Sequence, residues 1–323
     1  MDKNYLIGLK WILLISFLVR LVLILNPNSY TTFDEREYYD YGRGLSTDIG
    51  RPFFILILSK LSSSLIALRM IDLSFGLLSI FTIYKIGIKL FDEKVGNISA
   101  LILAFNPLHI MLSSLFLTDV IFLSFYLLFI HFIFQKKFDL SILFAVLAIF
   151  TRYEGFLLLI ITIFFFFHFK IKNKHELVKM ILVFMAVGLM LYPRISMFSQ
   201  SNIFILNNPI YLYLVTPFLI NGFLTTHSIA SLRKIFNNKF FFLTFFSFVI
   251  FFMATFTGFT LSDKFRYVLP TLPISSLFIS NKWKGSNFLI VLAFLNLFSG
   301  LFLALYFQEV KSSLLSFGIF GLK

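Results

Sequence analysis

The sequence predicts an all-α polytopic membrane protein, a helical bundle of about eleven transmembrane helices. Two observations predict this class. Hydrophobic residues make up 59% of the 323 residues and charged residues only 13%, whereas a soluble domain carries about 25% charged residues. The apolar residues also gather in runs that approach the roughly 20 helical residues needed to cross a hydrocarbon core of about 30 Å.

Measured against this length, the apolar runs predict spans near residues 5–25, 69–89, 96–113, 115–134, 138–150, 155–169, 178–193, 208–226, 240–260, 267–280 and 286–307. The first run is too long for a signal-peptide core and lacks a small-residue cleavage pattern, so we expect a retained anchor. The run 52–66 contains Lys60 and three serines, which favours a juxtamembrane helix in the first outer loop. No soluble domain and no internal repeat are expected.

The basic residues indicate how the chain lies in the membrane. Its 28 basic and 15 acidic residues leave a formal charge of +13, which in a soluble protein would suggest nucleic acid. Here the basic residues form short clusters between apolar runs, so we set nucleic acid aside in favour of the positive-inside rule. A cytoplasmic N-terminus puts sixteen basic residues inside, all but one of them lysine. The absence of cysteine excludes disulfides and thiolate metal sites.

The predicted outer side holds eight of the nine arginines. Lysine suffices to hold a loop in the cytosol, whereas the planar guanidinium of arginine binds phosphate oxygens in pairs. An arginine-rich outer face therefore favours an anionic ligand there. The alternative is that these arginines extend to lipid headgroups of the outer leaflet.

The first outer loop contains a dense polar segment, residues 31–45, with the sequence TTFDEREYYDYGRGL. Thr32 and Glu35 fit a capping box, which predicts a helix from Phe33 to about Gly44 with the Glu35 side chain reaching back to the cap. On that helix one face would carry Asp34, Glu37, Tyr38 and Tyr41, and another Glu35, Tyr39 and Gly42. The first-turn position favours an ionised Asp34, which could act as a general base. An ordinary solvated amphipathic loop is the alternative.

Other polar residues lie near the same predicted face. Asp119 is either a functional residue at the outer end of its span or the N-cap of a helix that begins at Val120. Arg69 and Asp72 are three residues apart and could form only a local ion pair. Glu154 is expected to hold Arg152 in place.

Histidine spacing offers no metal site. His109 is expected to be a satisfied interfacial histidine, and the other histidines show no ligand spacing. A divalent metal held by oxygens of Asp34 and Asp119 is conceivable but nothing in the sequence requires one.

The loop FDEREYYDYGRGL resembles the first extracytoplasmic loop of GT-C superfamily glycosyltransferases of the protein O-mannosyltransferase and lipid A aminoarabinose transferase type. In that group an Asp-Glu pair precedes an aromatic-rich juxtamembrane helix. Further matches follow in order: Arg51-Pro52-Phe53-Phe54; Arg69, Gly76 and Tyr84; Thr118-Asp119; Thr151-Arg152-Tyr153-Glu154-Gly155; and Lys264-Phe265-Arg266-Tyr267-Val268-Leu269-Pro270. The resemblance covers residues 1–170 well, and residues 171–260 only in hydropathy. The common double proline is a single Pro52, and the WWDYG-like motif and large soluble C-terminal domains of some relatives are lacking.

The resemblance implies a single GT-C domain over residues 1–323, with a catalytic module in 1–170, a first outer loop over 26–68 and variable C-terminal helices in 171–323. It implies an inverting transferase that moves mannose or a similar hexose from a polyprenyl or dolichyl phosphate to a hydroxyl of protein, lipid or glycan. No cofactor is required. The implied roles are Asp34 as base, Glu35 and Asp119 as positioning groups, Arg152, Lys264, Arg266, Arg51 and Arg69 at the donor phosphate, and Tyr38, Glu154 and Tyr267 at the acceptor or sugar.

Two other classes compete with this expectation. A transporter or lipid-linked-sugar flippase tends to carry internal repeats and ionisable residues near the bilayer midplane, whereas here acids and arginines collect at one predicted face. A non-catalytic subunit of a membrane complex would leave Asp34 solvated and far from Asp119 and Arg266.

Overall fold

The structure is a computed structural model that describes residues 8–26, 32–45, 53–156, 158, 162, 174–201, 269 and 272–283. Several predictions fall outside these residues: the spans 208–226, 240–260 and 286–307, most of 155–169, and the side chains of Arg51, Lys264, Arg266 and Tyr267. Over the described part the chain forms α1 (Leu9–Leu25), α2 (Phe33–Gly42), α3 (Phe53–Ser59), α4 (Leu65–Leu90), α5 (Glu93–Ala104), α6 (Pro107–Leu112), α7 (Thr118–Phe134), α8 (Phe138–Thr151), η1 (Tyr153–Phe156), α10 (Lys174–Ser201) and α15 (Leu272–Trp283).

The all-helical class is confirmed for the described residues, and most predicted spans match a helix. By length and composition, α4 is the one described helix long and apolar enough to cross a membrane, with 26 residues. Shorter apolar stretches occur in α7, α8 and α10. The short run at 52–66 contains α3, as the juxtamembrane prediction requires. The total of eleven spans stays a prediction.

The single span predicted over 96–113 is wrong, because the chain breaks it into α5 and α6. Asn106 supplies the break: its side-chain oxygen accepts hydrogen bonds from the amides of Leu108 and His109, at 3.0 and 3.2 Å. Pro107 then occupies the first turn of α6, where its missing N–H costs nothing. Proline also disfavours helical backbone at the residue before it, so the break follows from an Asn-Pro pair.

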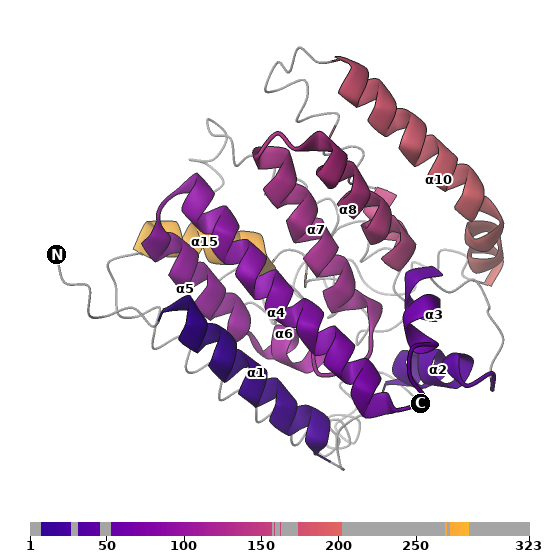
Figure 1. Cartoon of the computed structure of the whole chain (residues 1–323), viewed down its shortest axis with the longest axis horizontal. Helices are drawn as coiled ribbons and strands as arrows, with labels where there is room; N and C mark the ends of the chain where they lie inside the picture. Colours follow the sequence, from indigo (N-terminus) through magenta and orange to yellow (C-terminus); the bar gives the residue numbers. More distant parts are fainter. Residues whose placement is uncertain are drawn as a thin grey trace, which may run out of the picture.

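Helix α4 is the centre of the bundle, packed against α1, α5 and α7 (Figure 1). It meets α5 backbone to backbone, because a Cβ on Gly87 would lie 2.7 Å from the Cα of Gly96. Small residues permit this close approach of two helices. Helix α15 lies against α5, although the two are far apart in the sequence. The buried core runs through α7, whose residues from Thr118 to Leu127 are all buried.

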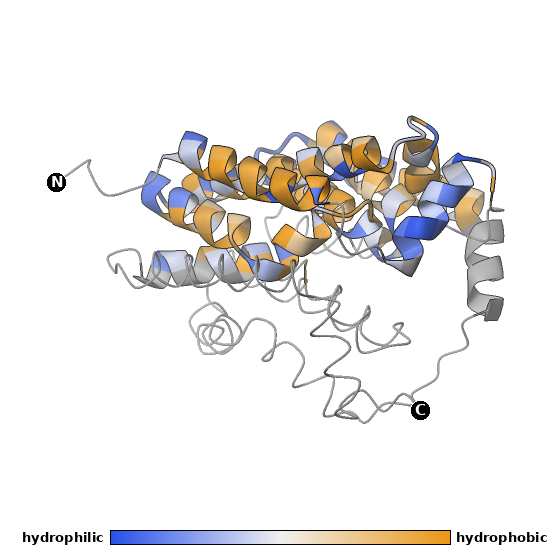
Figure 2. Cartoon of the chain, turned by 90° about the horizontal axis from the view of Figure 1, so that it is seen from below, coloured by the Kyte–Doolittle hydropathy of each residue, from blue (hydrophilic) through white to orange (hydrophobic). Residues whose placement is uncertain are grey.

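Polar residues gather at two ends of the bundle, with apolar side chains between them (Figure 2). One end holds α2, the starts of α4 and α7 and the end of α8. The other end holds the α4–α5 and α7–α8 turns with their lysines. Helix α4 joins the two ends over about 39 Å, at 1.5 Å per residue. Most described arginines and acids therefore collect at the first end, as the sequence indicated, whereas Asp92, Glu93 and Asp139 lie with the lysines at the other end.

Candidate active site

Helix α2 begins as predicted, with Thr32 as its cap. The Glu35 amide donates to Thr32 Oγ1 at 3.0 Å. The rest of the capping-box prediction is wrong, because the Glu35 carboxylate turns into the bundle and contacts other groups. Glu35 and Tyr38 are both buried, at 0% and 3% exposure. The prediction that put them on different faces is therefore wrong, since residues three apart share a helix face.

The far end of α2 rests on α3. A Cβ on Gly42 would collide with the backbone carbonyl of Ser59, so only glycine permits this contact. The Tyr39 hydroxyl donates to the Ser63 carbonyl at 2.9 Å and ties α2 to the segment before α4. Both contacts hold α2 and α3 together at the arginine-bearing end.

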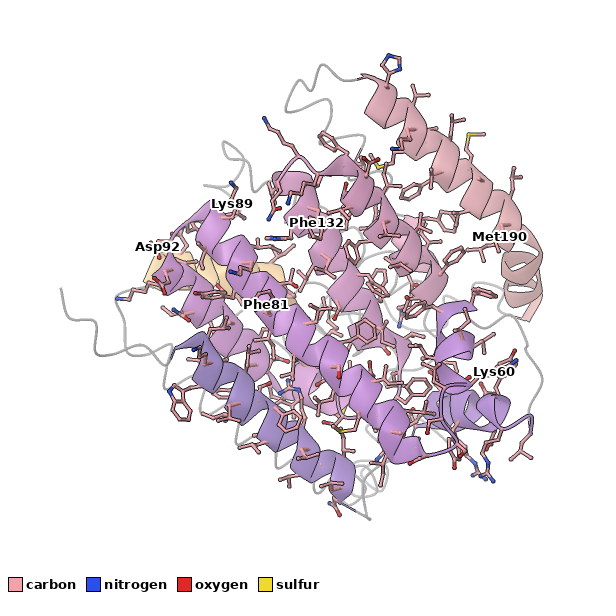
Figure 3. The ribbon with its side chains drawn as sticks, viewed as in Figure 1. Lys60, Phe81, Lys89, Asp92, Phe132 and Met190 are labelled. Carbon is pink, nitrogen blue, oxygen red and sulfur yellow. The ribbon has the colours of Figure 1, made fainter. Side chains whose placement is uncertain are left out.

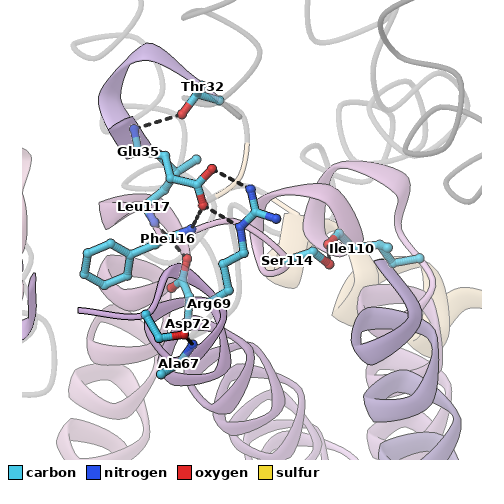
Figure 4. A network of polar contacts seen from close by, with 10 residues as sticks. Thr32, Glu35, Ala67, Arg69, Asp72, Ile110, Ser114, Phe116 and Leu117 are labelled. Carbon is cyan, nitrogen blue, oxygen red and sulfur yellow. Dashed lines mark hydrogen bonds and ion pairs between the residues drawn. The ribbon is translucent and has the colours of Figure 1, made fainter. Parts of the chain in front are cut away.

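Glu35 and Arg69 form a buried, two-pronged ion pair (Figure 4). Arg69 Nε donates to Oε1 and Nη2 to Oε2, each at 2.8 Å. The Phe116 amide also donates to Oε1, at 2.7 Å. Arg69 is only 3% exposed, so the guanidinium needs this carboxylate nearby to be tolerated. The ion pair of Arg69 is thus not merely local, since its partner lies 34 residues away.

The turn that precedes α7 is held by two carboxylates from different helices. Besides the Phe116 amide bound by Glu35, the next amide, of Leu117, donates to Asp72 Oδ2 at 3.0 Å. The Tyr38 ring packs edge-on against the Phe116 ring, with centroids 6.3 Å apart. These contacts lock α2 and α4 to the start of α7.

Asp119 lies in the first turn of α7 and contacts Arg152. Arg152 Nη1 donates to Asp119 Oδ1 at 2.5 Å, and Nη2 donates to Glu154 Oε1 at 2.9 Å. The alternative role of Asp119 as an N-cap is wrong, because α7 begins at Thr118 and its cap position is Leu117. Glu154 holds Arg152, as expected.

The position of Arg152 is determined by the tight turn that follows α8. Arg152 is the C-cap of α8, and its backbone amide donates to the Ala148 carbonyl at 2.8 Å. A Cβ on Gly155 would lie 2.6 Å from the Ile149 amide nitrogen, so the turn requires glycine. Arg152 and Glu154 keep 12% and 20% of their side-chain surface exposed. The outer edge of this pair is therefore partly exposed, whereas Asp119 is buried.

Asp34 precedes the buried Glu35 in the first turn of α2 and is half-buried. The two acids of the pair are thus in different environments: Glu35 is enclosed by Arg69 and the Phe116 amide, and Asp34 keeps access to solvent. The hydrogen bond between Glu35 and the Phe116 amide joins the first turn of α2 to the segment before α7. Asp119 lies three residues after Phe116 in that part of the chain.

Comparison with known proteins shows what the chain is similar to. Residues 49–196 match the family model described as dolichyl-phosphate-mannose-protein mannosyltransferase. The crystal structure of ArnT from Cupriavidus metallidurans in the apo state superposes with a TM-score of 0.63 over 84% of this chain, at 14% identity. The chain has the GT-C fold. It spans 59% of the ArnT chain. Comparison with curated proteins gives no match. This fold similarity agrees with the membrane-protein class that the apolar composition predicts.

Sequence reasoning missed a second polar cluster in the GT-C bundle, centred on Arg20 of α1. Its guanidinium is fully buried and uses all five N–H groups. Nε donates to Ser113 Oγ at 2.6 Å, and Nη1 to the Ser16 carbonyl at 3.0 Å and to the Ser16 hydroxyl. Nη2 donates to the Ala104 carbonyl at 3.1 Å and contacts His109 Nδ1 at 2.7 Å.

The contact with Arg20 determines the state of His109. A guanidinium only donates, so His109 Nδ1 must accept and the ring must carry its proton on Nε2. Nε2 then donates to Ser79 Oγ at 2.8 Å, and Ser79 donates to the Gly76 carbonyl at 2.7 Å. His109 is satisfied as expected, but it is wholly buried and not interfacial. An arginine inside a predicted span, four residues after a serine, was the signal for this cluster.

The gathering of arginines at one end of the bundle is explained in part by internal bonding. Arg20 has no N–H left for an anion, and Arg69 is held by Glu35. Arg152 is paired but accessible, and Arg36 and Arg43 lie on the exposed side of α2. Within the part of the chain that the structure describes, no group of three or more His, Asp or Glu side chains could hold a metal. Arg51, Lys264, Arg266 and Tyr267 lie outside the described residues, so their roles stay predictions.

Proposed function

We propose that the chain is an inverting glycosyltransferase that moves mannose or a similar hexose from a polyprenyl or dolichyl phosphate to an acceptor hydroxyl of a protein, lipid or glycan. One observation carries the proposal. A solvent-accessible Asp34 is locked, through Glu35 and Phe116, to the helix start that bears the Asp119–Arg152 pair. The match of residues 49–196 to the mannosyltransferase family model and the GT-C fold support the reaction class.

Asp34 is the proposed base. It lies in the first turn of α2, and its carboxylate takes the proton of the acceptor hydroxyl. The hydroxyl oxygen bonds to the anomeric carbon as the bond from that carbon to the phosphate oxygen breaks on the opposite side, which inverts the configuration. The departing polyprenyl phosphate keeps the electron pair of the broken bond. Its charge is stabilised by nearby cations, for which we propose Arg152, Lys264, Arg266 and Arg51.

The other site residues are proposed to position these groups. Glu35 holds α2, and the paired geometry of Arg69 supports a role in orienting Glu35 over a direct role at the phosphate. Asp119 and Glu154 orient Arg152. Tyr38 supports the acceptor side through its contact with Phe116, and Tyr267 is proposed to contact acceptor or sugar.

The proposed topology places the lysine end of the bundle in the cytosol and the site at the extracytoplasmic face of the cell membrane. A lipid-linked donor in the outer leaflet reaches a site at that level without leaving the bilayer. A transporter would need an ionisable residue free to bind within the bundle, and Arg20, the candidate, has every N–H group satisfied internally.

Transfer of a radiolabelled sugar from polyprenyl phosphate donors, measured in membranes that contain the full chain, tests the proposal. We expect transfer by wild type and a loss of about 10²-fold or more in the Asp34→Asn variant. Asp40→Asn is the matched control, because Asp40 lies on the same helix in an exposed pair with Arg36. It should keep wild-type activity. Absence of transfer with every donor, or full activity of Asp34→Asn, would overturn the assignment.

A further inference from the structure

A cluster of four lysines lies at the end of the bundle opposite the proposed active site. Lys85 and Lys89 come from the last turns of α4, and Lys136 and Lys137 from the turn between α7 and α8. Figure 3 shows Lys89 at the same end of the bundle as Phe132 near the end of α7. Lys85, Lys89 and Lys137 all act electrostatically on the His131 ring of α7, so they surround one point. All four lysines are exposed.

Few acidic groups lie near this cluster within the described residues. The ion pairs found there leave out all four lysines, whereas Lys179 at the same end is paired with Asp139. Asp92, the acid nearest in sequence to Lys89, caps α5 by accepting from the Val95 amide at 2.9 Å. Glu93 acts electrostatically on Tyr84, whose ring lies beside the Lys85 ammonium, so an acid is also near the cluster. The four lysines outnumber the nearby acids, and the cluster keeps a net positive charge.

Lys136 has a backbone conformation that usually favours glycine. Its φ of 59° makes it the one non-glycine residue with positive φ in the described part of the chain. The Lys136 amide donates to the Ile133 carbonyl at 3.1 Å, and the Lys137 amide to the Phe132 carbonyl at 3.0 Å. This bonding pattern ends many helices and usually has glycine at the position of positive φ. A side chain there opposes stability, which favours a role for its charge.

The positions of the side chains suit a phosphate. The Lys85 ammonium lies 5.3 Å from the centroid of the Phe81 ring and 5.8 Å from that of Tyr84, contacts that restrict where it extends. Below the lysines, the Gln135 amide nitrogen contacts His131 Nε2 at 2.7 Å and makes a polar floor. The cluster thus combines exposed ammonium groups with the half-buried polar side chains of His131 and Gln135.

We propose that Lys85, Lys89, Lys136 and Lys137 bind the phosphate headgroup of an anionic phospholipid in the leaflet at this end. The cluster caps two apolar helices, α4 and α7, which places it at headgroup level. Lysine stems cover apolar surface there and leave the ammonium groups in the polar layer. Each lysine near an anionic surface strengthens binding by about fivefold. The positive-inside rule requires lysines on this side but no preference for one lipid. This inference goes beyond the proposed glycosyltransferase and does not depend on it.

Native mass spectrometry of the full chain, purified with either phosphatidylglycerol or phosphatidylcholine, tests the site. We expect wild type to retain phosphatidylglycerol preferentially. A Lys85→Gln, Lys89→Gln, Lys137→Gln triple variant should retain at least about tenfold less, with phosphatidylcholine unchanged. The control is Lys179→Gln, an exposed lysine already paired with Asp139, which should bind as wild type does.

A single substitution separates binding from folding. Lys136→Gly should raise the unfolding temperature by about 2 °C, because glycine accepts positive φ, while weakening phosphatidylglycerol binding about fivefold. Opposite changes in stability and binding would support the site, since damage to the fold would lower both. Equal retention of the two lipids by wild type would overturn the proposal. Unchanged phosphatidylglycerol binding in the triple variant would overturn it as well.

Discussion

Arg69 donates to both oxygens of the Glu35 carboxylate, at 2.8 Å each, and joins α4 to α2 across 34 residues of sequence. Because a third donor, the Phe116 amide, binds the same carboxylate, this contact determines where α2 lies relative to α7. Glu35, which follows the proposed base in the sequence, therefore has a structural role, and Asp34 is left as the residue proposed to act in the reaction.

The Glu35–Arg69 pair gives a prediction about stability. Glu35→Gln should destabilise the protein by about 3 kcal/mol or more, because it leaves a buried guanidinium without a counter-charge. Thermal unfolding in detergent measures this. Asp40→Asn, which breaks only the exposed 3.9 Å pair with Arg36, should cost about 0.5 kcal/mol or less.

A double replacement distinguishes an ion pair from simple packing. Glu35→Leu with Arg69→Met should cost less than the sum of the two single changes, because neither charge is then left alone. Strict additivity of the three unfolding free energies would count against the pair.

The Asp119–Arg152 contact predicts a loss of activity without a matching loss of stability. Arg152→Lys keeps the charge but cannot bridge Asp119 and Glu154, so transfer from the lipid donor should fall at least about tenfold. The unfolding temperature should change less than transfer does, since lysine keeps a cation beside the buried Asp119 and the partly exposed Glu154. Lys179→Arg at the opposite end is the control and should leave transfer unaltered. Wild-type transfer by Arg152→Lys would remove this residue from the site.

The saturated guanidinium of Arg20 predicts that lysine cannot replace it. Arg20→Lys should cost roughly 2 to 4 kcal/mol, because an ammonium cannot serve five acceptors spread over a planar fork. Arg36→Lys makes the same change on a side chain that is 80% exposed and should be neutral. The comparison of the two unfolding curves checks the network, and equal curves would mean that the Arg20 bonds contribute little.

The backbone contact between α4 and α5 predicts an effect of one methyl group. Gly87→Ala puts a Cβ 2.7 Å from the Cα of Gly96 and should cost about 1 to 3 kcal/mol, because backbone atoms cannot move aside. Gly188→Ala in α10 is a matched control. Its Cβ would come no closer than 3.7 Å to Phe156, so alanine should stabilise the helix by about 0.5 to 1 kcal/mol. A neutral Gly87→Ala would contradict the close approach of α4 and α5.

The sequence by itself determined the helices and the gathering of acids and arginines at one end. These follow from hydropathy over about 20 residues and from local chemistry, such as the Thr32 cap of α2. The break at Asn106-Pro107 also follows from local sequence, but the long apolar run around these two residues favoured a single span in its place.

Only the tertiary structure decided which partner each buried polar group takes. Glu35 could serve its own helix cap or a distant arginine, and local spacing does not separate the two. Burial separates the two roles. A buried Arg69 without a carboxylate partner costs more free energy than a helix end whose amides can bind water. Arg20 likewise finds Ser113 across 93 residues, through a contact that only the packing of α1 against α4 and α6 creates.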